Sequence, residues 1–263
     1  MNENLKRKLP LILVGLIVLI FIVLLIINET DLFDNRKTHT FDEAVDKQVG
    51  AGTLNMTEKD GQFVVASKND VKQAMDVNND KDNLNHMDIS EKVPMSEKEL
   101  NNILKDKGIL KNKGKAFLKA QDEYEVNVLY LVSHALVETG NGQSDLAKGI
   151  EDDGEHYYNF YGIGAFDEDA VHTGSSFAKK QQWTSPEKAI MGGAKFVRNN
   201  YFENKQLSLY QMRWNPESPG EHQYASDIEW DENIATFMQR YYDDLGIKKD
   251  HVKKDHVKKD YYL

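Results

Sequence analysis

The feature that most constrains the fold is a strongly apolar run that ends in a single acidic residue. Val128 to Val132 is uninterrupted apolar sequence, and Asn127 before it is a favourable N-cap, which together predict a buried helix. Glu138 falls near the predicted end of that helix, where Gly140 and Gly142 can adopt the positive φ that terminates it. Charged side chains are seldom buried without a partner, and burial favours the neutral carboxyl group that a general acid requires. Glu138 is therefore the first candidate catalytic residue, and the alternative is a carboxylate that simply turns out to water.

Composition excludes several kinds of site. The 263 residues carry a formal charge of −10, which argues against a nucleic-acid partner because phosphate backbones are bound by clusters of Lys and Arg. The chain has no Cys, which excludes disulfides, thiol nucleophiles, Cys-ligated metals and a lipidated cysteine. The repeated Lys-Lys-Asp-His-Val sequence in 248–263 matches no compact metal site. We therefore expect no metal, no cofactor and a solvated tail.

An apolar segment near the N-terminus predicts a membrane anchor. Leu9 to Ile27 is long enough, at about 1.5 Å rise per residue, to cross a hydrocarbon core of about 30 Å. Basic residues precede the segment and acidic residues follow it, so the positive-inside rule places residues 1–8 in the cytoplasm. A cleavable signal peptide is the alternative, but no small-residue cleavage motif follows the apolar run. We expect a single-pass protein of the cell membrane whose remaining part is extracellular.

The polar segment 28–94 is predicted to be a small extracellular extension next to the membrane. Thr40 can cap a short helix, and two short apolar stretches flank Lys59-Asp60-Gly61, which is a plausible hairpin turn. Asp76 to Asp88 is dominated by Asn, Asp and Lys, which is typical of a loop. No catalytic constellation is present, so we expect the segment to set the distance from the membrane or to contact a neighbour.

The segment 95–247 is predicted to be one mainly α-helical (α+β) domain. Gly192-Gly193 lies within one expected helix and predicts close helix packing, because glycine disfavours a helix by about 1 kcal/mol per residue. Besides the apolar helix, helices are expected after the capping box at Ser96, over 114–123, after Thr184-Ser185-Pro186-Glu187, and over 231–245.

Aromatic and polar loops follow the apolar helix. Asn159 to Asp167 contains two glycines among aromatic residues, which suggests a backbone held close to another group, as in the wall of a cleft. Tyr210 to Pro216 and Gly220 to Asp227 combine flat apolar faces, which stack on pyranose rings, with polar groups that can bind hydroxyls. For any single aromatic residue, a core position beneath a loop is the more common alternative.

The sequence Ala135-Leu136-Val137-Glu138-Thr139-Gly140-Asn141-Gly142 resembles the signature of the peptidoglycan N-acetylglucosaminidases, family seventy-three of the glycoside hydrolases. The aromatic loops and Lys188 to Phe196 resemble, in the same order, the glucosaminidase part of staphylococcal autolysins over about Ser96 to Gly246. The resemblance implies a lysozyme-like glucosaminidase domain, with the Glu facing a long cleft. It also implies hydrolysis of the β-1,4 bond between N-acetylglucosamine and N-acetylmuramic acid in a peptidoglycan glycan strand, with Glu138 as general acid.

The resemblance also implies further site residues. The second catalytic group would be a carboxylate or, in substrate-assisted hydrolysis, a Tyr that positions the 2-acetamido group. Asp167, Tyr224 and Asp227 lie on the family motifs and are the candidates, although Asp also favours turns for local reasons. The candidate substrate-binding residues are Asn159, Tyr161, Gly162, Trp214 and Gln223.

Two other functions remain open at this point. A lytic transglycosylase or muramidase also uses a leading Glu, since fold alone does not decide chemistry. A non-catalytic scaffold could bind glycan or a membrane partner, although the intact Glu138 argues against it. A lone membrane span gains by packing against other helices, and Gly15 offers a point of close approach, so a polytopic membrane partner is also expected.

Overall fold

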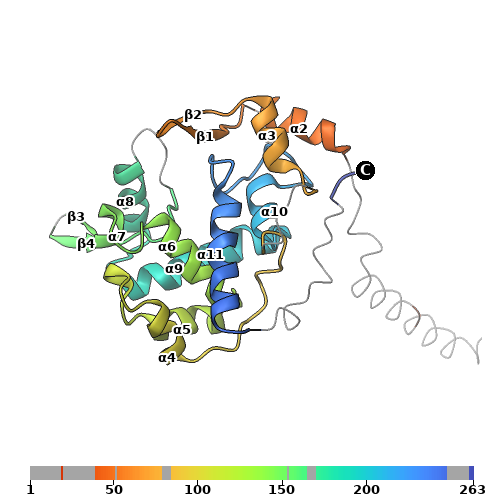
Figure 1. Ribbon diagram of the computed structural model, residues 1–263. Helices are drawn as coiled ribbons and strands as arrows, with labels where there is room; N and C mark the ends of the chain where they lie inside the picture. The colour runs from red at the N-terminus through yellow and green to blue at the C-terminus, as the bar shows by residue number, and fades with distance from the viewer. Residues whose placement is uncertain are drawn as a thin grey trace, which may run out of the picture.

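The computed structural model describes residues 39–50, 52–78, 84–152, 154–164, 170–247 and 261–263, together with Leu19. Over this part of the chain the protein is mainly helical and carries two antiparallel two-stranded hairpins (Figure 1). The elements in chain order are α2 (Phe41–Gly50), β1 (Met56–Lys59), β2 (Gln62–Val65), α3 (Lys68–Met75), α4 (Glu97–Ile103), η1 (Gly108–Leu110), α5 (Gly114–Tyr124), α6 (Val128–Glu138), α7 (Asp145–Lys148), β3 (Ile150–Asp152), β4 (Glu155–Tyr157), α8 (Ala170–Lys180), α9 (Pro186–Asn200), η2 (Phe202–Asn204), α10 (Leu209–Trp214) and α11 (Trp230–Asp244).

Helix α6 is the predicted apolar helix, and it lies in the larger of two hydrophobic clusters. Its residues from Val128 to Leu136 are all buried. The Asn127 side chain caps it by accepting hydrogen bonds from the amides of the second and third helical residues, at 2.9 and 3.0 Å. α11 packs against α6, while α5 packs against both α6 and α9. The helix ends at Glu138, as predicted, and Gly140 and Gly142 follow with φ of 53° and 78°.

The two glycines inside α9 are points of close contact. A Cβ at Gly193 would lie 2.0 Å from the ring of Tyr161, and a Cβ at Gly192 would lie 2.0 Å from the indole nitrogen of Trp183. The predicted close approach is confirmed, but the prediction of a helix as the partner is wrong. Both partners are aromatic rings carried by loops.

Residues 39–76 form a small folded unit, which we call the N-terminal lobe. α2 begins after the predicted cap at Thr40, whose hydroxyl accepts a hydrogen bond from the Glu43 amide at 3.3 Å. The β1–β2 hairpin has the predicted turn, with Asp60 and Gly61 at φ of 52° and 78°. α3 was not predicted, and it is stabilised by a capping box at Ser67. Figure 1 shows the lobe lying across one end of the helical domain.

The lobe is docked on the helical domain through backbone hydrogen bonds and shared apolar contacts. The Met56 amide donates to the Ser226 carbonyl at 2.8 Å, and the Ile228 amide donates to the Met56 carbonyl at 2.9 Å. The lobe's apolar residues are too sparse to form a core alone, so they are buried only in this arrangement. The second hydrophobic cluster comprises Ala44, Val45, Ala66, Val71 and Met75 of the lobe with Tyr210, Trp214, Ile228 and Tyr262.

The prediction of a solvated tail over 248–263 is wrong for its last residues. Tyr262 is 9% exposed and its hydroxyl lies 2.8 Å from that of Tyr210. The ring of Tyr261 stacks on Tyr210 with centroids 4.9 Å apart. The two aromatic rings supply apolar area that the charged repeat before them lacks. Residues 248–260 lie outside the described residues.

The predicted anchor over Leu9 to Ile27 lies, apart from Leu19, outside the described residues. Within the part of the chain that the structure does describe, no helix is both long enough and apolar enough to cross a membrane.

Candidate active site

The Glu138 carboxyl group is held between an indole and a stretch of bare backbone. The side chain retains 24% of its exposure at the end of α6. Nε1 of Trp230 donates a hydrogen bond to Oε1 at 3.0 Å. Oε2 faces Gly162, where a Cβ would lie only 2.6 Å away. Gly162 also has a φ of 62°, so both the available space and the backbone conformation require glycine at this position.

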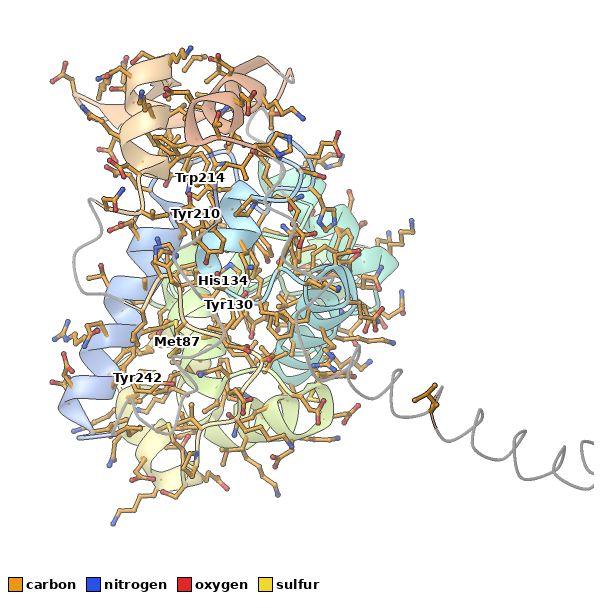
Figure 2. All side chains as sticks on the ribbon, turned by 90° about the vertical axis from the view of Figure 1, so that its right-hand side faces the viewer. Met87, Tyr130, His134, Tyr210, Trp214 and Tyr242 are labelled. Atoms are coloured by element: carbon orange, nitrogen blue, oxygen red, sulfur yellow. The ribbon has the colours of Figure 1, made fainter. Side chains whose placement is uncertain are left out.

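A buried polar row on α6 leads to this carboxyl group. His134, one turn before Glu138, is fully buried, and its Nε2 lies 3.4 Å from Oε1 of Glu138 without hydrogen-bond geometry. Its Nδ1 lies 3.0 Å from the hydroxyl of Tyr130, one further turn back (Figure 2). The imidazole is also enclosed edge-on, with centroids 4.9–5.3 Å apart, by the rings of Tyr161, Tyr224 and Trp230.

Tyr224, a candidate for the second catalytic group, packs against Trp230 and His134, the two side chains that neighbour the Glu138 carboxyl group. Its hydroxyl donates to the backbone carbonyl of Tyr161 at 2.9 Å, and its ring stacks on Trp230 with centroids 4.7 Å apart. Burial, followed by the nearby Tyr130 and Glu138, raises the pKa of Tyr224 well above its ordinary value. The side chain is therefore a neutral phenol throughout the physiological range, able to donate a hydrogen bond but not to act as a phenolate base.

Asp227 lies within electrostatic reach of Glu138 but also has a local role. Its Oδ1 accepts a hydrogen bond from the Glu229 amide at 3.0 Å, in the turn that precedes α11. Burial raises the pKa of Asp227 and the charge of Glu138 adds to the rise, while the Glu229 amide and the Arg213 guanidinium oppose it. The position is compatible with a second carboxyl group at the site and equally with the capping of a turn. Asp167, the other candidate carboxylate, lies outside the described residues.

The loop that carries Gly162 is fixed from within. Asn159 is 2% exposed, and its side-chain amide donates to the carbonyls of Ile163 and Gly174 at 2.8 and 3.2 Å. Tyr161 is fully buried and presents only its carbonyl group to Tyr224. Of these three predicted binding residues, only Gly162 lies against the Glu138 carboxyl group. Asn159 and Tyr161 instead hold the loop that positions Gly162.

Trp214 and Gln223 lie away from the carboxyl group. Trp214 is fully buried beneath the N-terminal lobe, and its indole donates to Oδ2 of Asp231 at 3.1 Å (Figure 2). The Gln223 carbonyl oxygen accepts from Gln48 and Arg213 at 2.8 and 3.0 Å, and its amide donates to a lobe carbonyl. In this structure both residues join the lobe to the domain. Stacking of a sugar on Trp214 is excluded because the lobe covers the ring.

Two residues at the site were missed by the sequence analysis. His134 could have been found, since Tyr130, His134 and Glu138 recur every four residues and therefore share one helix face. Trp230 carries no such signal, because it is 92 residues from Glu138 along the chain. Only the packing of α11 on α6 brings its indole to the carboxyl group.

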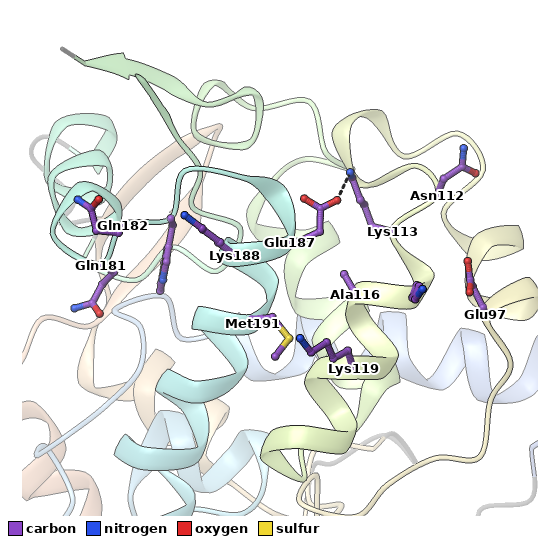
Figure 3. A pocket seen from close by; sticks show the side chains of 12 residues that line it. Glu97, Asn112, Lys113, Ala116, Lys119, Gln181, Gln182, Glu187, Lys188 and Met191 are labelled. Carbon is purple, nitrogen blue, oxygen red and sulfur yellow. Dashed lines mark hydrogen bonds and ion pairs between the residues drawn. The ribbon is translucent and has the colours of Figure 1, made fainter. Parts of the chain in front are cut away.

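A separate pocket of about 780 Å³ lies between α5 and α9 and contains none of the predicted site residues (Figure 3). The pocket is lined by Glu97, Asn112, Lys113, Lys115, Ala116, Lys119, Gln181, Gln182, Trp183, Glu187, Lys188 and Met191.

Within the described ranges, no group of three or more His, Asp or Glu side chains could hold a metal ion.

The fold and the Glu138 site together define a class of protein. A partly buried carboxyl group against a Trp ring, in a mainly helical domain, is the arrangement that lysozyme uses to protonate a leaving sugar oxygen. A family profile described as mannosyl-glycoprotein endo-beta-N-acetylglucosaminidase matches residues 114–243. The bifunctional autolysin of Staphylococcus epidermidis is 49% identical over 160 residues, which are 58% of this chain and 12% of that protein. The chain thus spans about an eighth of the length of such relatives.

Solved structures extend the similarity to almost whole chains. A catalytic mutant of Staphylococcus aureus autolysin E, in complex with the disaccharide NAG-NAM, is 58% identical with a TM-score of 0.78 and covers 86% of this chain and 99% of its own. Glucosaminidase B of S. aureus is 40% identical with a TM-score of 0.60 and covers 79% of this chain and 86% of its own. The chain belongs to the glucosaminidase family of glycoside hydrolases.

The motifs in the sequence also predict a particular similarity to SagB, the membrane-anchored staphylococcal glucosaminidase. The match to glucosaminidase B agrees with that prediction, although autolysin E shares more identical residues. The predicted mainly helical glucosaminidase domain is confirmed by the fold and by these matches.

Proposed function

We propose that this protein hydrolyses the β-1,4 bond between N-acetylglucosamine and N-acetylmuramic acid within peptidoglycan glycan strands, with Glu138 as general acid. The observation that carries the proposal is the Glu138 carboxyl group, which ends the apolar helix α6 between the Trp230 indole and Gly162. Supporting it, the autolysin E structure bound to NAG-NAM is that of a catalytic mutant in which a glutamate is replaced by alanine.

The two carboxyl oxygens have different surroundings, and this suggests their roles. Oε2, beside the bare backbone of Gly162, would carry the proton and transfer it to the glycosidic oxygen as the bond to the anomeric carbon breaks. Oε1 accepts the Trp230 N–H at 3.0 Å, so the indole would stabilise the carboxylate that is left. Water then adds to the anomeric carbon and restores the proton, which gives a new reducing end. The water would be activated by Asp227 or Asp167, or replaced in a first step by the substrate's acetamido group next to Tyr224.

The test is to digest purified peptidoglycan with the full chain and with Glu138→Gln, and to identify the new chain ends by mass spectrometry. We expect N-acetylglucosamine at the reducing end and a loss of at least about 10²-fold in the variant, which is what a general acid contributes. Reducing-end or 1,6-anhydro muramic acid would instead assign the chain to the muramidases or lytic transglycosylases. Cleavage by Glu138→Gln at the wild-type rate would remove Glu138 from the mechanism.

The substrate's location forms a second part of the proposal. With Leu9 to Ile27 as a single uncleaved span, residues 1–8 would be cytoplasmic and the enzyme would face outward. A tether raises the effective concentration only of substrate within its reach, so the protein would trim glycan close to the membrane. A polytopic membrane protein packed against the span is the partner that we propose, because a lone span gains by helix contacts.

The anchor is tested by replacing residues 1–28 with a cleavable signal peptide in a strain that lacks the gene. We expect the secreted enzyme, at matched expression, to leave the membrane-proximal glycan strands longer than the anchored enzyme does. Normal strand lengths with the secreted form would show that the anchor is dispensable.

A further inference from the structure

The β1–β2 hairpin has one face with exposed apolar side chains, and it lies outside the region that the family profile matches. In its register, Glu58 is opposite Phe63 and Met56 is opposite Val65. Directly opposed residues of an antiparallel pair point to the same side, so these four share a face, which we call the Phe63 face. Phe63 is 60% exposed and Val65 is 70% exposed. Such exposure of large apolar groups side by side is uncommon unless they meet a ligand or a partner.

The opposite face of the hairpin is already occupied. Thr57 is 7% exposed. Lys59 forms an ion pair with Asp70 of α3, with Nζ and Oδ2 2.9 Å apart. This face turns toward α3, and the Phe63 face, on the other side of the hairpin, must therefore turn away from α3.

The direction of the Phe63 face follows from the way β1 joins the catalytic domain. Met56 and Asp227 form a parallel β-bridge, and bridged neighbours present their side chains to the same side of a sheet. Asp227 therefore projects on the same side as the Phe63 face. The charges of both Glu58 and Glu138 also act on Asp227 and raise its pKa. Figure 1 shows the hairpin extending beyond the N-terminal end of α11, which begins with Trp230.

We propose that the Phe63 face binds pyranose rings of the same glycan strand that Glu138 cleaves, so that the N-terminal lobe supplies a substrate subsite. The inference rests on the proposed function for the identity of the glycan. A pyranose ring has an apolar C–H face that stacks on an aromatic ring. Its hydroxyls can donate hydrogen bonds to a neighbouring carboxylate such as Glu58. Continuity with the Glu138 site favours a glycan strand over other occupants, because a polymer held at Glu138 must extend past its neighbours.

The test compares Phe63→Ala with wild type in the full chain, on glycan strands whose peptides have been removed. Contact with a pyranose ring adds uniform binding, so we expect KM to rise about three- to tenfold while kcat stays unchanged. Phe63→Trp should restore the wild-type KM, because it keeps a flat ring. Gln62→Ala alters the adjacent position on the opposite face, and Val49→Ala removes an exposed apolar group elsewhere in the lobe; both should match wild type.

Binding to the same strands is also measured in a Glu138→Gln background, which separates this inference from the proposed function. Weaker binding with Phe63→Ala in that background is expected whether or not cleavage occurs. An unchanged KM and unchanged binding would overturn the subsite even if Glu138 is the general acid. An effect seen only on strands that retain their peptides would assign the face to the peptide and overturn a glycan contact.

Discussion

At the scale of single residues, the site depends on Gly162 as much as on the acid itself. A Cβ at this position would lie 2.6 Å from Oε2 of Glu138, and the φ of 62° is one that L side chains rarely adopt. We expect Gly162→Ala to lower kcat by at least about tenfold, because it displaces the carboxyl group from its place beside Trp230. Steady-state kinetics would measure this, with thermal unfolding to show that the domain remains folded. A variant with wild-type kcat would mean that the carboxyl group tolerates the shift.

The identity of the second catalytic group also depends on single residues. The Tyr224 phenol is held neutral beside Glu138 and donates to the Tyr161 carbonyl, whereas the Asp227 carboxylate accepts a local amide before α11. We expect Tyr224→Phe to reduce kcat by about 10²-fold and Asp227→Asn by less than about tenfold. Rates on one glycan substrate, at matched folded fraction, make the comparison. A greater loss with Asp227→Asn would assign the second role to the carboxylate.

At the scale of secondary-structure elements, α9 must lack a side chain where the loop that carries Gly162 packs against it. A Cβ at Gly193 would lie 2.0 Å from the Tyr161 ring. We expect Gly193→Ala to destabilise the domain by about 1–3 kcal/mol, because the ring must move, and to reduce activity through the attached Gly162. Urea unfolding would measure the change, with exposed Lys195→Ala as the control in the same helix. Equal stability of the two variants would show that the loop adapts without cost.

At the scale of the whole molecule, Asp231 joins three separate parts of the chain. Its Oδ2 accepts hydrogen bonds from Asn85 and from Trp214, each at 3.1 Å, and the residue itself belongs to α11. Burial raises the pKa of Asp231 from 3.8 to about 7, with Asn85 and Arg213 opposing the rise. The folded protein thus binds this proton more tightly than the unfolded chain does. The stability that the proton provides is complete below pH 3.8 and is lost as the pH rises through about 7.

Asp231→Asn should remove this dependence while keeping an oxygen acceptor for Asn85 and Trp214. Other carboxyl groups act in the opposite direction, so the quantity to measure is the difference in free energy of unfolding between variant and wild type. We expect that difference to favour the variant by more than about 1 kcal/mol at pH 8 compared with pH 4.5. Urea titrations at several pH values would measure it. A difference that does not change with pH would show that Asp231 is ionised in both states.

The sequence by itself determined the parts of this protein that depend on local physics. The uninterrupted apolar run and its flanking Asn and Gly residues located α6 with its Asn127 cap and its end at Glu138, and the turn chemistry of Asp60-Gly61 located the β1–β2 hairpin. The family motif around Glu138 indicated the expected reaction and the role of Glu138 as general acid. Each of these signals is contained within a few residues, so no knowledge of the rest of the chain was needed.

The tertiary structure alone decided which side chains surround Glu138 and what covers Trp214. Trp230 meets the carboxyl group from 92 residues away, and the lobe buries Trp214 although its own sequence resembles a polar tether. The burial of an aromatic ring depends on which distant surface reaches it, and that is a property of packing rather than of local pattern. For the same reason, only the bridge between Met56 and Asp227 decides that the exposed apolar face of the hairpin lies on the same side as Asp227.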